Sequence, residues 1–409
     1  MGCEMRTLLT LLLSFLVLWA QQPSKAIFIE PKRGYYDTIE AKANEFKAPK
    51  KKTQKTVMKV DLSNIKIPKS ISEFKYVWHN TPISQGITNT CWSFSTTSFF
   101  ESEIYRLKNK KIRLSPMYNA YLEYIEKATE FVKTRGKTHI GEGSMADALL
   151  RLWKKYGCVP YDVYTGLLDG QEVYDHAAMF SEIKSFLESV KKNNFWSETF
   201  VIDGIKNILN TYMKEPPTEF TYEGKKWTPQ QFFQNYVGLN LDDYYSIISL
   251  NKYPFYEKIV YEVPDNWWFS DEYYNVPLNE FMQIINFAIE KNISMSIGGD
   301  VSEPGIDSWA KVAVVPEFDI PFDKINDDAR MFRFYNGTTY DDHGVHLIGY
   351  TDIDGKRWYL IKDSGAGSRN TGDKGYYFFH EDYVKLKIVN FLIHKDGIPD
   401  NIKQKLSIK

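Results

Sequence analysis

The chain has 409 residues, of which 43% are hydrophobic, enough to bury one or two large cores, and this excludes a mostly disordered protein. Its 51 basic and 52 acidic residues give a net charge of −1, so a nucleic-acid binder that relies on overall positive charge is not expected. Three cysteines are too few for a disulfide scaffold or a multi-cysteine zinc site. No histidine pair has metal-ligand spacing, and we predict no metal and no cofactor.

The chain begins with a segment typical of export. Arg6 precedes an apolar run of about 13 residues that ends at Ala20, which is short for a membrane span and typical of a secretory signal. We predict a signal peptide at residues 1–26, with cleavage after Ala20 and an uncleaved anchor as alternatives. Cys3 lies before the run and leaves with the peptide. The mature protein is then expected to be exported, periplasmic or secreted, with no further membrane contact.

Residues 27–60 are polar and rich in lysine. We interpret them as a solvated N-terminal arm, with a binding patch for an acidic partner as the alternative. A single domain is predicted from residue 61 to residue 409.

The first half of this domain is predicted to be helical. Thr90 is expected to cap a helix that runs to about Arg106. Ser115, followed by Pro116, is the expected N-cap of a second helix. Residues 146–156 form a third amphipathic segment, which Gly157 closes, and residues 278–291 form a later helix.

The second half turns to strands, which are predicted at residues 293–297, 345–351, 358–362, 375–379 and 388–394. Between the halves lies an aromatic-rich insertion at about 162–275, whose aromatic side chains are expected to form core and interface. Helices followed by strands favour an α+β fold with two packed halves over repeating βαβ units.

The strongest functional signal is the segment from Gln85 to Cys91, where Cys91-Trp92-Ser93-Phe94 begins the first predicted helix. A thiol in the first turn of a helix lies at the positive end of the helix dipole, which stabilises the thiolate. A thiolate is the attacking species in acyl transfer. The Gln85 amide and the Cys91 N–H are placed to donate to a developing oxyanion. The alternative, a small buried cysteine, is disfavoured by this context.

A cysteine nucleophile needs a base, and His343 is the best candidate among seven histidines. It lies at the start of a predicted strand, and Asp363 follows at the end of the next one. If these strands are antiparallel neighbours, their ends meet, and Asp363 orients the imidazole. His346, on the same strand, is interpreted as structural. Cys158 is expected to be a buried core thiol.

These residues resemble the papain-like cysteine peptidases. By that resemblance Cys91 is the nucleophile, His343 the base and Gln85 the oxyanion-hole residue, and Asp363 takes the place of the family's Asn. Glu142 and Gly143 resemble the backbone that binds extended peptides, and Trp92 and Asp342 are also expected to contact substrate. The resemblance implies a two-lobed fold with a helical left lobe, an antiparallel β-barrel-like right lobe and a large helical insertion.

The interval from Cys91 to His343 is 252 residues (343 − 91), against roughly 130–150 in ordinary papain-like enzymes. The excess matches the aromatic insertion and resembles the bleomycin hydrolase and aminopeptidase C branch. Further stretches similar to that branch are residues 114–118, 156–160, 274–278 and 394–399. This implies a peptide-hydrolysing aminopeptidase that forms homo-oligomers, hexamers in that family.

The chain departs from the family pattern in three places. Asp363 replaces Asn, which is expected to raise the pKa of His343 and favour its imidazolium form. Gly365 replaces the usual Trp, which is expected to leave the Asp363–His343 bond open to water. Thr88 replaces a disulfide cysteine of secreted relatives.

Three alternatives to an aminopeptidase stay open. Family members bind the substrate's amino group with their own C-terminal carboxylate, and the tail here, from Asp400 to Lys409, is short. An endopeptidase is therefore an alternative specificity. A catalytically weak binding or assembly protein is the alternative function, and another amide hydrolase on the same fold is a third reading.

Overall fold

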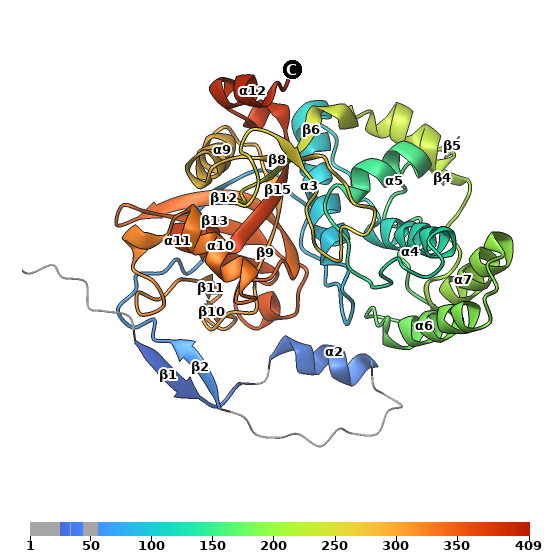
Figure 1. Ribbon diagram of the computed structural model, residues 1–409, viewed down its shortest axis with the longest axis horizontal. Helices are drawn as coiled ribbons and strands as arrows, with labels where there is room; N and C mark the ends of the chain where they lie inside the picture. Colours follow the sequence, from blue (N-terminus) through green and yellow to red (C-terminus); the bar gives the residue numbers. More distant parts are fainter. Residues whose placement is uncertain (1–24, 33, 44–55) are drawn as a thin grey trace, which may run out of the picture.

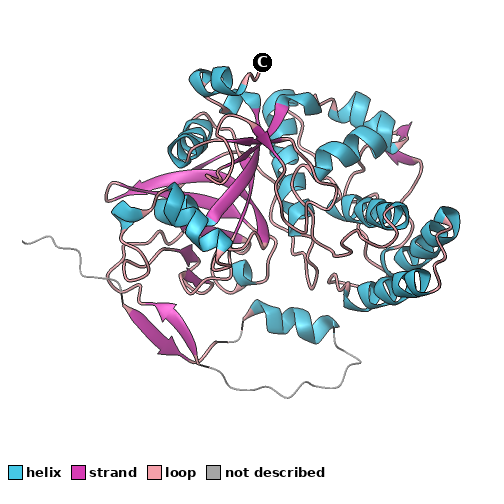
Figure 2. Ribbon diagram, in the orientation of Figure 1, coloured by secondary structure: helices cyan, strands magenta, loops and turns pink. Residues whose placement is uncertain are grey.

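The structure is a computed structural model that describes residues 25–32, 34–43 and 56–409 (Figure 1). Most of the predicted signal peptide, residues 1–24, lies outside the described residues. One side of the molecule is mostly helical, and the other holds most of the strands together with further helices, as Figure 2 shows. No helix in the described ranges is long and apolar enough to cross a membrane.

The helices of the first lobe are α3 (Cys91–Lys108), α4 (Pro116–Lys133), α5 (Ala148–Tyr156), α6 (Ala177–Lys192), α7 (Glu198–Met213) and α8 (Pro229–Gln231). Those of the second lobe are α9 (Leu278–Glu290), α10 (Asp327–Tyr335), α11 (Glu381–Lys387) and α12 (Asp400–Leu406). The predicted helices are confirmed to within about two residues at each end.

Local capping explains several of these boundaries. The Ser115 hydroxyl accepts the Tyr118 N–H at 3.0 Å, and Pro116 occupies the first turn of α4, as expected. Gly157 ends α5 with φ of 76°. Thr90 precedes α3, but its side chain caps no N–H and instead pairs with the Thr88 hydroxyl at 2.6 Å. The predicted Thr90 side-chain cap is therefore wrong.

The strands are β1 (Ala26–Ile29), β2 (Val57–Val60), β3 (Lys75–Tyr76), β4 (Phe220–Tyr222), β5 (Lys225–Trp227), β6 (Tyr244–Ile248), β7 (Lys258–Ile259), β8 (Tyr273–Asn275), β9 (Met295–Gly299), β10 (Ile306–Asp307), β11 (Val312–Ala313), β12 (His343–Ile353), β13 (Lys356–Lys362), β14 (Tyr376–His380) and β15 (Ile388–His394). The main sheet has the order β10-β11-β14-β13-β12-β9-β15-β6-β8-β7, and β3 pairs with β12.

The α+β class is confirmed, but two details of the expected architecture need correction. The strand order of the main sheet is linear, so the second lobe is an open sheet and not a barrel, and two of its pairs are parallel. The insertion at 162–275 is not helical throughout: it contains α6, α7 and α8, and β4 and β5 pair with each other between α7 and α8. Its last part supplies β6, β7 and β8, because Tyr244–Ile248 pairs with β15 and extends the main sheet.

Helix α3 lies where the two lobes meet. Its buried aromatic residues Phe99 and Phe100 belong to the core of the helical lobe. Its opposite side reaches the sheet, where Thr96 pairs with Ser296 of β9 at 3.0 Å. Because α3 is packed against both cores, its first residue, Cys91, has a fixed position relative to strands β12 and β13.

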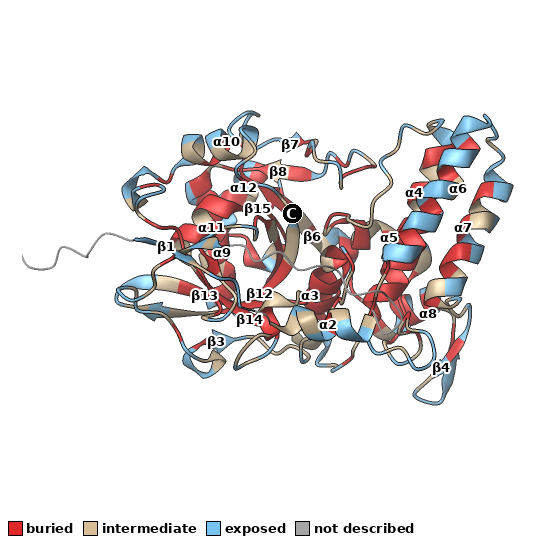
Figure 3. Cartoon of the chain, turned by 90° about the horizontal axis from the view of Figure 1, so that it is seen from below, coloured by how far each residue is buried: buried red, intermediate tan, exposed pale blue. Residues whose placement is uncertain are grey.

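The described part of the predicted arm is docked on the molecule rather than free in solvent. Strands β1 and β2 form an antiparallel pair, and α2 (Tyr35–Ala43) follows β1. The Tyr35 N–H donates to Asn370 at 2.6 Å in the sheet lobe, and Lys42 pairs with Glu172 in the helical lobe. Figures 1 and 3 show α2 crossing beneath α3, and Figure 3 shows the exposed outer faces of α6 and α7.

Candidate active site

The turn before Cys91 is held in place by a neighbouring backbone segment. The Ile87 N–H donates to the Tyr174 carbonyl at 2.8 Å, and Gly86 adopts φ of +65°. A Cβ at Gly86 would lie 2.3 Å from the Tyr174 oxygen. The chain therefore enters α3 along a path that only glycine permits, and Cys91 is the first helical residue, partly exposed and not in a disulfide.

This packing predicts that Gly86→Ala destabilises the protein by about 1–3 kcal/mol, since it combines a strained φ with a backbone clash. Urea unfolding of the variant measures this loss. Gly224→Ala is the matched control, because Gly224 also has positive φ (+74°) but no atom within 4 Å of its would-be Cβ. Equal losses in the two variants would show that the Tyr174 contact contributes nothing.

The structure brings His343 and Asp363 together as predicted from the strand pattern. Strands β12 and β13 are antiparallel, with His346 opposite Lys362, so the start of one meets the end of the other. His343 Nε2 lies 2.7 Å from Asp363 Oδ1. Burial alone lowers the pKa of His343, but the charges of Asp363 and Cys91 and their hydrogen bonds outweigh it and raise that pKa well above its usual value.

Asp363 is shielded from water, contrary to the expectation drawn from Gly365. The residue is only 5% exposed. The buried Arg369 guanidinium donates to the carbonyls of Asp363 and Gly365 at 3.1 and 3.0 Å, and the Gly365 N–H donates to Asp363 Oδ1 at 3.0 Å. Burial would raise the pKa of Asp363, but His343, Gly365 and Arg369 together lower it to about 2. The carboxylate is therefore charged at neutral pH.

Gln85 is buried beside the same turn. Its Nε2 donates to the Thr88 carbonyl at 2.6 Å, and its Oε1 accepts the Ser364 hydroxyl at 2.7 Å. Its backbone N–H donates to the Ser364 carbonyl at 3.0 Å. These bonds tie the loop before α3 to the residue after Asp363, and one N–H of the amide is left for another acceptor.

The four predicted substrate-binding residues lie along one cavity. Trp92 is buried, and its ring N–H donates to the Glu142 carbonyl at 3.0 Å. The Glu142 carboxylate accepts the Asn89 N–H at 2.9 Å and thereby links the cleft wall to the loop before Cys91. The Asp342 carboxylate accepts the Val301 N–H at 3.0 Å and the Ser302 hydroxyl. Trp92, Glu142 and Asp342 therefore also hold the walls of the cavity.

The cavity has a volume of about 270 Å³ and contains both Cys91 and His343. One wall is the segment from Gly141 to Ala146, and the other comes from β9, β12 and β15. It is large enough for a few side chains of a peptide, and its polar lining suits main-chain and charged groups.

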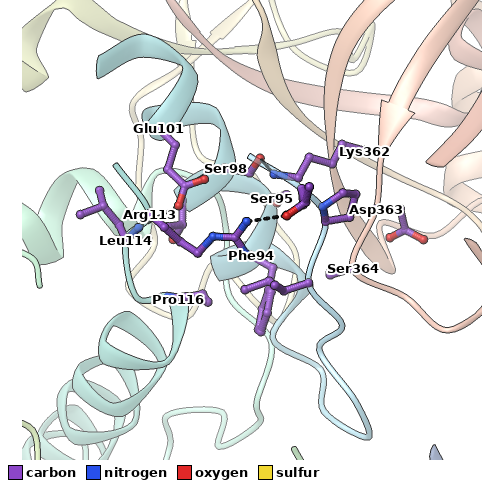
Figure 4. Close-up of a pocket in the computed structure, with 14 residues that line it drawn as sticks. Phe94, Ser95, Ser98, Glu101, Arg113, Leu114, Pro116, Lys362, Asp363 and Ser364 are labelled. Atoms are coloured by element: carbon purple, nitrogen blue, oxygen red, sulfur yellow. Dashed lines mark hydrogen bonds between the residues drawn. The ribbon is translucent and has the colours of Figure 1, made fainter. Parts of the chain in front are cut away.

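A second, smaller pocket lies behind the Asp363–Ser364 turn (Figure 4). There Lys362 donates to the Ser98 hydroxyl at 2.7 Å, and Ser98 lies 2.8 Å from His346 Nδ1. Burial and the positive charge of Lys362 lower the pKa of His346 well below its usual value. His346 is therefore a neutral, fully buried ring bonded to α3, and it does not line the cavity with Cys91.

The predicted core thiol, Cys158, is 2% exposed, and burial raises its pKa. Sequence reasoning missed Asp265, Asp341, Asn390 and Arg369. Asp341 had a local signal, since it lies two residues before His343. Asp265 lies in the insertion and Arg369 in a short 3-10 helix, and only the fold brings Asp265 to the cavity and Arg369 to Asp363.

The fold and this constellation define a papain-like protein. The solved structure of PepW from Lactobacillus rhamnosis superposes with a TM-score of 0.62 at 19% identity, over 81% of this chain and 84% of that one. Aminopeptidase C of Lactobacillus delbrueckii subsp. lactis is 24% identical over 78% of this chain and 81% of its own length. Aminopeptidase C of Streptococcus thermophilus is 23% identical over 76% and 80%.

The sequence pattern of the Peptidase C1-like family matches residues 35–409. The chain therefore belongs to the Peptidase C1-like family and is a cysteine-type peptidase, as its sequence predicted.

Proposed function

We propose that the protein is a cysteine aminopeptidase in which Cys91 is the nucleophile and His343 the general acid and base. The observation that carries this is the position of Cys91 at the start of α3, in one cavity with an imidazole that Asp363 holds at 2.7 Å. The names of the relatives, which are aminopeptidases C, W and G, support the exopeptidase reading.

In the proposed reaction these residues act in turn. The Cys91 thiolate attacks the scissile carbonyl, and the oxyanion accepts hydrogen bonds from the Cys91 N–H and the Gln85 amide. The C–N bond then breaks as the His343 imidazolium gives its proton to the leaving amine. Water, deprotonated by His343, attacks the thioester, and the N-terminal residue leaves as a free amino acid. The Cys91 thiolate leaves as the acyl group is released, and because His343 keeps the proton that it took from water, the thiolate–imidazolium pair is restored.

The test is a digest of a synthetic peptide library in two forms, with free and with acetylated N-termini, followed by mass spectrometry. We expect stepwise loss of single residues from the free-amine peptides and at least about 10-fold slower cleavage of acetylated ones. The Cys91→Ala chain is the control for contaminating peptidases. Equal cleavage of both forms would identify an endopeptidase instead. No cleavage of either form would favour the catalytically weak binding protein.

We also propose that the protein is exported, on the basis of the apolar run that ends at Ala20. Fractionation of the producing cells, followed by N-terminal sequencing of the mature chain, tests this. A cytosolic chain that retains Arg6 would contradict it. Sedimentation of the same material measures whether the chain is a homo-oligomer, which the family resemblance implies.

A further inference from the structure

The walls of the active-site cavity carry several carboxylates. Beyond Cys91 and His343, the lining includes the acidic residues Glu142, Asp265, Asp341 and Asp342. Among the lining residues, all of which the structure describes, there is no lysine or arginine. The basic side chains of the lining are His139 and His343, and His343 is already paired with Asp363, so the four acidic residues outnumber the basic ones and favour a cationic ligand.

Two of the four carboxylates are already occupied. Glu142 accepts the Asn89 N–H, and both oxygens of Asp342 accept hydrogen bonds from Val301 and Ser302. These bonds shape the cleft, and they leave these side chains less suited to a ligand.

The other two carboxylates face the cavity with open acceptors. Asp341 Oδ2 accepts the Tyr261 hydroxyl at 3.0 Å and the Asn390 amide at 2.6 Å, while Oδ1 points towards Gly298, 2.9 Å from its would-be Cβ. The Asp265 carboxylate lies over Gly143, 2.1 Å from its would-be Cβ. Among the described residues, none donates a hydrogen bond to Asp265 or forms an ion pair with it, and none donates a hydrogen bond to Asp341 Oδ1.

These two carboxylates come from opposite walls of the cavity and are close enough to repel each other. Burial, together with the charges of Asp265 and Asp342, raises the pKa of Asp341 to about 7 even though Tyr261 and Asn390 oppose this. The buried Lys127 lies behind the wall and donates to the carbonyls of Gly141 and Gly143. A cation between Asp265 and Asp341 would relieve this repulsion.

Glycine at positions 143 and 298 keeps this space open. Any side chain at Gly143 would displace the Asp265 carboxylate, and any side chain at Gly298 would crowd Asp341. The C-terminal residues of the sequence pack elsewhere, since Ile402, Leu406 and Ile408 are buried in the core of the sheet lobe.

We propose that Asp265 and Asp341 form a cation-binding subsite of the cleft, which holds an ammonium or guanidinium group of the peptide substrate. This rests on the proposed function, since it is the specificity of the same cavity. The cation has two possible sources with the same chemistry, the free α-amino group of the substrate and a basic side chain near the scissile bond. Asp265 and Asp341 are specificity residues and take no part in bond breaking.

The experiment measures binding in the full-length Cys91→Ala chain, so that it does not depend on turnover. Three probes are titrated by calorimetry. The first is a tetrapeptide with uncharged side chains and a free, cationic N-terminus. The second is its acetylated, neutral form, and the third is an acetylated form with one cationic lysine. We expect the two cationic probes to bind at least about 10-fold more tightly than the neutral one. Adding Asp265→Asn and Asp341→Asn together should remove that difference.

Asp203→Asn, on the outer surface of α7, is the matched control for a lost carboxylate, and thermal unfolding verifies that each variant is folded. If Asp265→Asn and Asp341→Asn together weaken the binding of the free-amine probe alone, the α-amino group is the source of the cation. If they weaken the binding of the lysine probe alone, the source is the basic side chain. The proposal is overturned if the Cys91→Ala chain binds all three probes with equal affinity, or if the two Asp→Asn substitutions weaken the binding of all three probes equally. A failure of the proposed function is distinct, because it appears as absent turnover in the unmodified chain.

Discussion

Cys91→Ala is expected to lower kcat/KM for peptide hydrolysis by roughly 10³-fold or more, since no other described thiol lines the cavity. The same substitution should remove covalent labelling by a thiol-alkylating peptide analogue at neutral pH. Mass spectrometry of the digested, labelled protein locates the modified cysteine. The expected result is one label per chain, on the peptide that contains Cys91.

Cys158→Ala is the matched control for this experiment. Cys158 is 2% exposed, and burial raises its pKa, so its thiol is protonated and out of reach of the reagent. The control should keep both activity and labelling, at a stability cost of about 1 kcal/mol for the small cavity it leaves. Labelling that persists in Cys91→Ala, or that disappears in Cys158→Ala, would contradict the assignment of Cys91 as the nucleophile.

The parts of the site that were predicted from sequence depend on short-range patterns. Cys91 was predicted at the start of a helix because Thr90 before it resembles an N-cap, and α3 does begin at Cys91 although the Thr90 side chain caps no N–H. His343 and Asp363 meet because two consecutive strands pair as a hairpin, which is the simplest connection between them. In both cases the sequence order alone limits where the side chain can lie, and the structure places both as expected.

The parts that were missed depend on contacts between distant segments. Asp265 reaches the cavity only because the insertion ends in strands that join the main sheet and fold back over Gly143. The shielding of Asp363 was missed for a similar reason. A glycine at position 365 indicates exposure when read locally, whereas Arg369, one 3-10 turn later, folds back and covers the turn. Neither contact has a periodic signal in the sequence.

Asp363→Asn is expected to preserve activity but to move its alkaline limit to lower pH. Asp363 Oδ1 accepts both the His343 Nε2–H at 2.7 Å and the Gly365 N–H at 3.0 Å, and an asparagine oxygen can accept the same two bonds. The substitution therefore removes the charge and keeps the geometry. Since the charge of Asp363 raises the pKa of His343 more than any other group does, that pKa falls in the variant.

The sign follows from the protonation state that the reaction needs. Peptide hydrolysis requires the His343 imidazolium, which is lost as the pH rises through its pKa, so a lower pKa brings this loss to lower pH. Asp363 itself, with a pKa of about 2, stays charged over the whole assay range, so its own titration does not distort the wild-type profile.

Asp363→Ala separates charge from orientation. It removes the acceptor as well, so the imidazole loses its fixed position, and we expect kcat/KM to fall by about 10²-fold across the whole pH range. The measurement is kcat/KM for one free-amine peptide from about pH 4 to about pH 10 in all three proteins. Identical profiles for the wild type and Asp363→Asn would show that the Asp363 charge does not set the proton affinity of His343 during turnover, and that the carboxylate acts only as a hydrogen-bond acceptor.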